Sequence, residues 1–198
     1  MKKERTLVVI KPDGVQRTLI GETIKRIERI GLKLVGLKML IPDKDFIEKH
    51  YTLHPEWKEN VGKKSIEAYK KKGLTPPSSD PQEAGDRVLQ VLVNYMISGP
   101  VVAMVWQGAH AAEIVRKIVG GTEPLSSDLG TLRGDFVLDS YQMADTDERA
   151  VRNLVHASGD ATEAEMEVKY WFKENELLEY RLLQEQILYD INLDGILE

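Results

Sequence analysis

The sequence predicts an α+β protein: a split βαβ, or ferredoxin-like, four-stranded antiparallel sheet with helices on its faces. Short apolar, β-branched runs alternate with segments whose apolar residues recur every three or four positions, which indicates strands alternating with helices. The order is strand, helix, strand, two helices, strand, helix, strand, helix. Only four strands can be found, which favours this class over a doubly wound sheet. We expect the 198 residues, which show no internal repeat, to form one domain over residues 1–198.

The first half of the chain supplies two of the strands. Its apolar runs are ended by Gly, Pro or Asp, which are common turn and cap residues. These features predict, in order, a strand over residues 6–10, a turn at 11–14, a helix over 20–30 with Gly31 as its C-cap, a strand over 32–39, and a helix from Asp43 or Asp45 to about Tyr51.

Two segments look like insertions into this pattern. Residues 58–85 are rich in Lys and contain a Pro- and Ser-rich stretch, which indicates a surface segment with one helix over 65–72. Residues 139–151 form the second. A passive surface loop is one interpretation of each; the other is that the basic first insertion covers the active site or alters subunit contacts.

The second half supplies the other two strands and ends in a helical extension. Helical spacing from Val88, apolar runs, and Gly or Asp at the expected ends define its elements. They are, in order, a helix over residues 88–98, a strand over 100–107, a helix over 110–119, a loop over 121–132, a strand over 135–138, a helix capped by Asp160 or Thr162 through 172, and a helix over 177–191.

Composition excludes several classes of protein. The chain has no Cys, so it has no disulfides, thiolate metal site or cysteine nucleophile. Its first apolar run, residues 7–10, is too short for a signal peptide, so we expect a cytoplasmic location and no membrane association. The net charge is −5, and residues 160–198 alone sum to −8. That acidic end makes nucleic-acid binding unlikely as a function.

One of the four histidines is a candidate nucleophile. His156 lies between a charged stretch and a predicted helix, with Ser158 two residues on and Glu167 where that helix could turn its carboxylate back. A carboxylate on one ring nitrogen positions the other for nucleophilic attack; a plain loop histidine beside a capping serine is the equal alternative. The other three fit surface or capping roles better: His50, His54 and His110. No pair of histidines has the spacing of a metal site.

Three cations suit phosphate binding. Lys11 ends the first strand, Arg116 lies in the helix predicted over 110–119, and Arg133 precedes a Gly-Asp pair. Ammonium and guanidinium groups both bind phosphate oxygens, and Thr122 and Asn153 could add hydrogen bonds to a phosphate or a ribose. Singly, each cation is more often a solvated surface charge. No Gly-rich phosphate loop is present, so side chains would have to hold the phosphates.

Five segments of this sequence, taken in order, resemble the nucleoside diphosphate kinase family. The resemblance covers most of the chain outside the two insertions and the tail. The segments are TLVVIKPDGVQR at residues 6–17, His50-Tyr51, YMISGPVVAMVW at 95–106, GTLRGDF at 130–136, and NLVHAS at 153–158.

The resemblance implies a reaction and a set of roles. The family transfers the γ-phosphoryl group of a nucleoside triphosphate, typically ATP, to a nucleoside diphosphate by a ping-pong route through a phosphohistidine, with Mg²⁺ held mainly by the nucleotide phosphates. His156 would be the nucleophile, oriented by Glu167 and Ser158. Lys11 and Tyr51 would contact the transferred group. Arg116, Thr122 and Arg133 would contact the other phosphates. Asn153, with Lys11, would contact the sugar. A homo-oligomer, either a hexamer or a tetramer of dimers, is also implied.

This chain departs from the family pattern at three places. Where the family has an aromatic residue against the base, this chain offers Val88 or Leu89, with Leu92 as the partner wall. Ala157 replaces the usual glycine after the active-site histidine. Asp160 is shifted by one position, which puts its role near Mg²⁺ in doubt.

Two other functions are possible for this fold. One is a non-catalytic nucleotide-binding or interaction module that keeps the fold. Loss of Lys11, Arg116 or His156 would favour that function, but all three are present. A nucleic-acid-binding sheet would need exposed aromatic residues on two strands and a basic surface. The predicted strands and the charge balance fit neither requirement, so an enzyme is the favoured interpretation.

Overall fold

The sheet has four antiparallel strands, in the order β2-β3-β1-β4, which confirms the predicted fold class. The computed structural model describes residues 3–192. The central strands β1 and β3 carry the longest apolar runs, and Val8 of β1 pairs with Met104 on one side and Ala157 on the other. The strands are β1 (Glu4–Ile10), β2 (Lys33–Leu40), β3 (Val101–Gly108) and β4 (Val155–Ala157).

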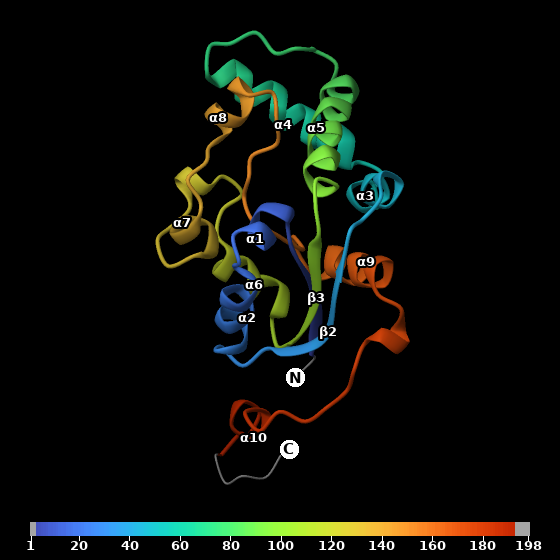
Figure 1. Cartoon of the computed structure of the whole chain (residues 1–198), viewed down its shortest axis with the longest axis vertical. Helices are drawn as coiled ribbons and strands as arrows, with labels where there is room; N and C mark the ends of the chain where they lie inside the picture. Colours follow the sequence, from blue (N-terminus) through green and yellow to red (C-terminus); the bar gives the residue numbers. More distant parts are fainter. Residues whose placement is uncertain (1–2, 193–198) are drawn as a thin grey trace.

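Helices cover both faces of the sheet, so the alternate side chains of β1 and β3 are buried on both sides. One core contains Val8 and Trp106 and is covered by α2 and α6; the other contains Val9 and is covered by α3, α5 and α9. Figure 1 shows α2 and α6 on one side, α9 on the other, and α4, α5 and α8 together at one end. The helices are α1 (Pro12–Gln16), α2 (Ile20–Glu28), α3 (Lys44–Tyr51), α4 (Trp57–Lys71), α5 (Pro81–Met96), α6 (Ala111–Val119), η1 (Pro124–Ser126), α7 (Leu132–Phe136), α8 (Tyr141–Thr146), α9 (Ala161–Trp171), η2 (Glu174–Glu176) and α10 (Glu185–Leu188).

The predicted fourth strand over residues 135–138 is wrong. Those residues follow or end α7, which is capped by Thr131, whose side chain accepts a hydrogen bond from the Gly134 amide at 3.0 Å. The fourth strand is β4, three residues long and therefore too short for its periodicity to be read from sequence. His156 thus lies on an edge strand, not in a loop. The predicted turn at 11–14 is also different, because Pro12 begins the short helix α1.

The segment predicted as a surface excursion is mostly helical. The helix expected over residues 65–72 is α4, which begins at Trp57 and packs on α5. The two helices meet at Gly62 and Gly85, where an added Cβ would overlap a backbone carbonyl of the other helix. Glycine has a low helix propensity, but here it permits close backbone approach, which is why the sequence pattern was misleading.

The helix predicted over residues 177–191 is also wrong, since only α10 forms there. The backbone of this segment bonds to the sheet edge instead: the Leu178 amide donates to the Val35 carbonyl at 2.7 Å, where β2 has an irregularity in its register. The Tyr180 hydroxyl donates to the Leu34 carbonyl at 2.8 Å. Tertiary hydrogen bonds therefore outweigh helix propensity in this segment.

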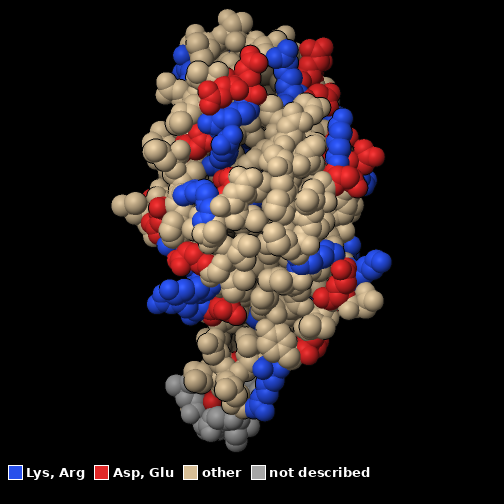
Figure 2. Space-filling model, viewed as in Figure 1, with Lys and Arg blue, Asp and Glu red and all other residues tan. Residues whose placement is uncertain are grey.

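The face in Figure 2 mixes acidic and basic side chains on either side of a broad uncharged stripe. No helix in residues 3–192 is long and apolar enough to cross a membrane.

Candidate active site

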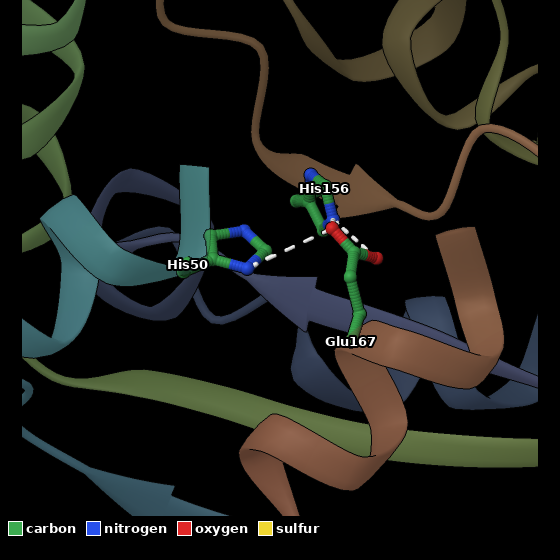
Figure 3. A group of neighbouring side chains, drawn as sticks. All are labelled: His50, His156 and Glu167. Carbon is green, nitrogen blue, oxygen red and sulfur yellow. Dashed lines mark hydrogen bonds and ion pairs between the residues drawn. The ribbon is translucent and has the colours of Figure 1, made fainter. Parts of the chain in front are cut away.

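His156 and Glu167 form the centre of the site. The Nε2 atom of His156 on β4 lies 2.9 and 3.1 Å from the two carboxylate oxygens of Glu167 on α9. Burial alone would raise the pKa of Glu167, but the charge of His156 and hydrogen bonds from His156 and Ser158 lower it to about 2. The carboxylate is therefore ionised and accepts a hydrogen bond from Nε2–H, which in the neutral ring leaves the lone pair on Nδ1. Figure 3 shows that second nitrogen directed away from Glu167.

Ser158 supports this pair from behind. Its hydroxyl is fully buried and donates to Glu167 at 2.6 Å, while the Leu7 amide of β1 donates to the same hydroxyl oxygen at 3.2 Å. The chain of contacts links the central strand to the carboxylate. It therefore fixes the position of Glu167 and, through it, the ring of the histidine.

The expectation that His50 is a surface or capping residue is wrong. His50 is buried on α3, and its ring meets the ring of His156 edge-on at 4.8 Å between centroids. Its Nδ1 accepts a hydrogen bond from the Trp171 indole at 3.1 Å. Burial, and then the charge of His156, lower the pKa of His50 to about 3, so the ring is neutral at physiological pH. The adjacent Tyr51 in the family-like pair was the one sequence signal for this residue.

Lys11 and Asn153 form a buried polar pair at the end of β1. The Lys11 ammonium donates to the Asn153 side-chain oxygen at 2.7 Å, and the Asn153 amide nitrogen donates to the Thr122 carbonyl at 3.0 Å. The ammonium also lies 4.9 Å from the centre of the Tyr95 ring. Burial, and then the charge of Arg133, lower the pKa of Lys11 to about 7. The charge of Asp13 opposes this shift, but no carboxylate in residues 3–192 forms an ion pair with Lys11, so the pair is suited to an incoming anion.

The two arginines differ in how much they can offer a ligand. Arg133 on α7 is buried and donates four hydrogen bonds to backbone carbonyls of the 120–121 turn and of residues 153 and 155. A guanidinium has five N–H groups, so one remains for a ligand. Burial, and then the charge of Arg116, lower the pKa of Arg133 to about 10, so it stays charged. Arg116 on α6 is exposed and lines the cavity described below.

One cavity of about 710 Å³ collects the predicted residues. Ser158 is the exception, since it lies behind Glu167. Tyr51 has a buried hydroxyl with no hydrogen-bond partner among residues 3–192, and burial raises its pKa, so it is a neutral donor. The predicted residues that line the cavity are Lys11, Tyr51, Val88, Leu92, Arg116, Thr122, Arg133, Asn153, His156 and Glu167.

The apolar end of the cavity lies over α5. Val88 and Leu92 line it, whereas Leu89 is buried in the core, so Val88 is the residue that faces the cavity. The other walls come largely from the two segments predicted as insertions. Residues 58–85 line the cavity, as one of their two interpretations expected, whereas no lining role was predicted for residues 139–151 or for Trp57. The cavity-lining side chains include Trp57, Val61 and Tyr69 of α4, and Tyr141 and Asp145 of α8. The spacing of 57, 61, 65, 68 and 72 on one helix face was the available signal.

A histidine with one ring nitrogen held by a carboxylate, and three cations that line the same cavity, are suited to phosphoryl transfer on this α+β sheet. The family model described as "Nucleoside diphosphate kinase" matches residues 4–67 and 81–177. The chain belongs to the nucleoside diphosphate kinase family, which confirms the predicted family and enzyme class.

Individual relatives agree with this assignment. The nucleoside diphosphate kinase of Pyrobaculum aerophilum is 46% identical over 183 residues, covering 90% of this chain and 100% of the relative. A solved structure of an NDP kinase from that organism has a TM-score of 0.86 at 45% identity, again over 90% and 100% of the two chains. A structure from Borrelia burgdorferi, described as a transition-state mimic with bound vanadate and ADP, has a TM-score of 0.75 at 33% identity and covers 92% of this chain and 95% of that one.

Proposed function

We propose that the chain transfers the γ-phosphoryl group of a nucleoside triphosphate, typically ATP, to a nucleoside diphosphate through phospho-His156, and so supports nucleoside triphosphate synthesis. The observation that carries this is the contact between Nε2 of His156 and the ionised Glu167, which favours the tautomer with its lone pair on Nδ1. In the first half-reaction Nδ1 bonds to the γ-phosphorus and the bond to the bridging oxygen breaks, releasing the diphosphate. In the second, a terminal oxygen of the acceptor diphosphate displaces the histidine.

Glu167 acts as the positioning and charge-balancing group. When Nδ1 bonds to phosphorus the ring becomes cationic, and the proton on Nε2 stays on the ring against the carboxylate. The low pKa of Glu167 means that this counter-charge is in place before the reaction begins. Ser158 holds the carboxylate in that position through its 2.6 Å hydrogen bond.

The cations and the hydroxyl groups bind the phosphates. Lys11 and Tyr51 contact the transferred group. Arg116, Thr122 and the one remaining N–H of Arg133 contact the other phosphates. Phosphoryl transfer depends mainly on positioning and on neutralising charge, and buried cations achieve both.

The nucleoside extends toward α5. Asn153 and Lys11 bind the sugar, and Val88 and Leu92 bind the base through apolar contact. Because the base then makes few hydrogen bonds through its edges, the enzyme accepts several nucleotides as donor and acceptor.

Magnesium bound to the nucleotide phosphates fits this cavity. Among residues 3–192, the one grouping with metal-ligand spacing is His50, His156 and Glu167. Three of its donor groups are already used: the Glu167 carboxylate accepts from His156 Nε2, and His50 Nδ1 accepts from the Trp171 indole. The residues therefore favour Mg²⁺ carried by the nucleotide rather than caged by the protein. Such an ion would neutralise phosphate charge during transfer.

We also propose a homo-oligomer. Along β2, an edge strand, Leu37 and Met39 are exposed, and Ile41 follows with 71% of its surface exposed. Exposed apolar side chains on an open sheet edge favour burial against a second copy. Sedimentation velocity would distinguish a hexamer from a tetramer. Fractionation of the source cells would test the predicted cytoplasmic location.

Intact mass after incubation with Mg-ATP tests the reaction. We expect the wild-type chain to gain one acid-labile phosphoryl group, which a chase with GDP removes, and His156→Ala to gain none. Binding of ATP without any gain of mass would refute the proposed enzyme and favour a nucleotide-binding module.

A further inference from the structure

An ion pair joins the α4 and α8 walls of the cavity. The Lys72 ammonium, at the C-terminal end of α4, lies 2.8 Å from a carboxylate oxygen of Asp145 on α8. Both side chains line the cavity and are about a third exposed (36% and 37%), so the pair lies at its mouth. Figure 1 shows α8 beside the end of α4, although the two helices are far apart in the sequence.

The α8 wall is anchored at its base. Asp139 is buried and accepts two hydrogen bonds from the Arg149 guanidinium, at 2.7 and 3.1 Å, and one from the Arg152 amide at 2.7 Å. Ser140 caps α8 by accepting a hydrogen bond from the Met143 amide at 3.2 Å. These contacts close the 139–152 segment into a loop on itself. The contact with Lys72 is thus a separate attachment, on the side facing α4.

The α4 wall is fixed to α5 by close packing at Gly62 and Gly85. Because α5 carries Val88 and Leu92, α4 stands next to the proposed base-binding end of the cavity. Lys72 itself lies within residues 68–80, which the family model does not match. The ion pair is therefore made by a residue outside the part of the chain that defines the family.

Each wall adds an aromatic side chain to the cavity lining. Tyr69 lies on α4 three residues before Lys72, and Tyr141 lies on α8 one turn before Asp145. This chain has Val88 where the family has an aromatic residue. An aromatic face offers more contact area to a base than an aliphatic one. The distance between these two walls therefore affects how tightly a nucleoside is held.

We propose that Lys72 and Asp145 form a clasp that holds α8 against α4 over the nucleoside end of the cavity and so tightens nucleotide binding. Both are positioning residues, since they act through the walls that they join. The proposal rests on the proposed function, because it takes a nucleotide as the occupant of the cavity.

The direction in which nucleotide affinity changes when either residue is replaced distinguishes a clasp from a simple charge effect. Nucleotides are anions, so if the two residues acted only through their fields, loss of Lys72 would weaken binding and loss of Asp145 would strengthen it. A clasp predicts that both losses weaken binding. An ion pair this exposed is worth a factor of about two to five in an equilibrium constant.

Calorimetric titration with ADP, together with kcat and KM for ATP, tests the clasp. The variants are Lys72→Met, Asp145→Asn and the exchanged pair, Lys72→Asp with Asp145→Lys. The matched control is Lys63→Met, which breaks the exposed pair with Glu59 on α4, outside the cavity. We expect each single variant to raise the Kd for ADP about two- to fivefold with kcat unchanged, the exchanged pair to restore it, and the control to leave it unchanged.

Tighter or unchanged ADP binding by Asp145→Asn would overturn the clasp. A fall in kcat at unchanged Kd would also overturn it, since that assigns the pair to the chemical step. Phosphorylation of the wild type at saturating ATP, followed by mass, tests the proposed function separately. Binding of ADP without phosphorylation refutes that reaction but leaves the comparison of the variants valid, whereas a chain that binds no ADP refutes both.

Discussion

Lys11 is expected to take up a proton when a nucleotide binds. Burial, and then the charge of Arg133, lower its pKa from 10.5 to about 7, so charging it costs about 5 kcal/mol more in the folded chain than in water. At pH 8, one unit above that pKa, only about a tenth of the molecules carry the proton. A phosphate beside the ammonium favours the charged form and returns the pKa toward its ordinary value. Binding of ADP at pH 8 should then take up about 0.9 of a proton per site.

Calorimetry in two buffers with different heats of ionisation measures this uptake directly. The apparent binding enthalpies at pH 8 should differ by about 0.9 times the difference between the buffer heats, whereas at pH 5.5 Lys11 is already charged and should contribute no uptake. Lys11→Arg is the matched control, since a guanidinium keeps its proton at both pH values. Equal enthalpies in the two buffers at pH 8, or full uptake in Lys11→Arg, would refute the assignment of a nearly neutral lysine.

Three further predictions concern the groups around the cavity. Glu167→Gln should slow phosphorylation of the active-site histidine by ATP roughly 100-fold, as rapid quenching would show, because an amide cannot balance the cationic ring; Glu165→Gln, on the exposed side of α9, should react normally. Gly62→Ala should lower the free energy of unfolding in urea by about 1–3 kcal/mol, because its methyl group would overlap the backbone of α5, whereas Gly21→Ala, with open space around it, should cause no loss. Between pH 6.5 and 3 the unfolded chain protonates His50 and the folded chain does not. The free energy of unfolding should therefore decrease by up to about 5 kcal/mol as the pH is lowered through this range, and by less in His50→Gln.

The strands and helices predicted correctly are those with a strong local pattern. The buried runs that form β1 and β3, and the helix ended by Gly120, are long enough for their period to be read. The errors fall where tertiary contacts decide the structure. β4 is three residues long and forms only by pairing with β1, and residues 177–184 bond to the edge of β2 instead of forming a helix.

The contact between His156 and Glu167 was predictable, because chemistry and the family pattern agreed there. His50 was not, because burial is what separates a site histidine from a surface one, and burial depends on α9 folding back to place Trp171 against it. The contact between the α4 and α8 walls could not be predicted, for a different reason. Their residues are ordinary in type, and only the folded arrangement brings Lys72 to Asp145.

The charges around the site meet one requirement: His156, the proposed nucleophile, must lie near cations that bind phosphate and still keep a lone pair on its ring. Glu167, with its pKa near 2, keeps a fixed negative charge against Nε2. His50 has its pKa near 3 and adds no positive charge next to His156. Lys11 has its pKa near 7, so its full charge is developed when a phosphate is bound. The substrate itself therefore completes the cationic environment, and the proton uptake predicted for Lys11 is the direct measure of that coupling.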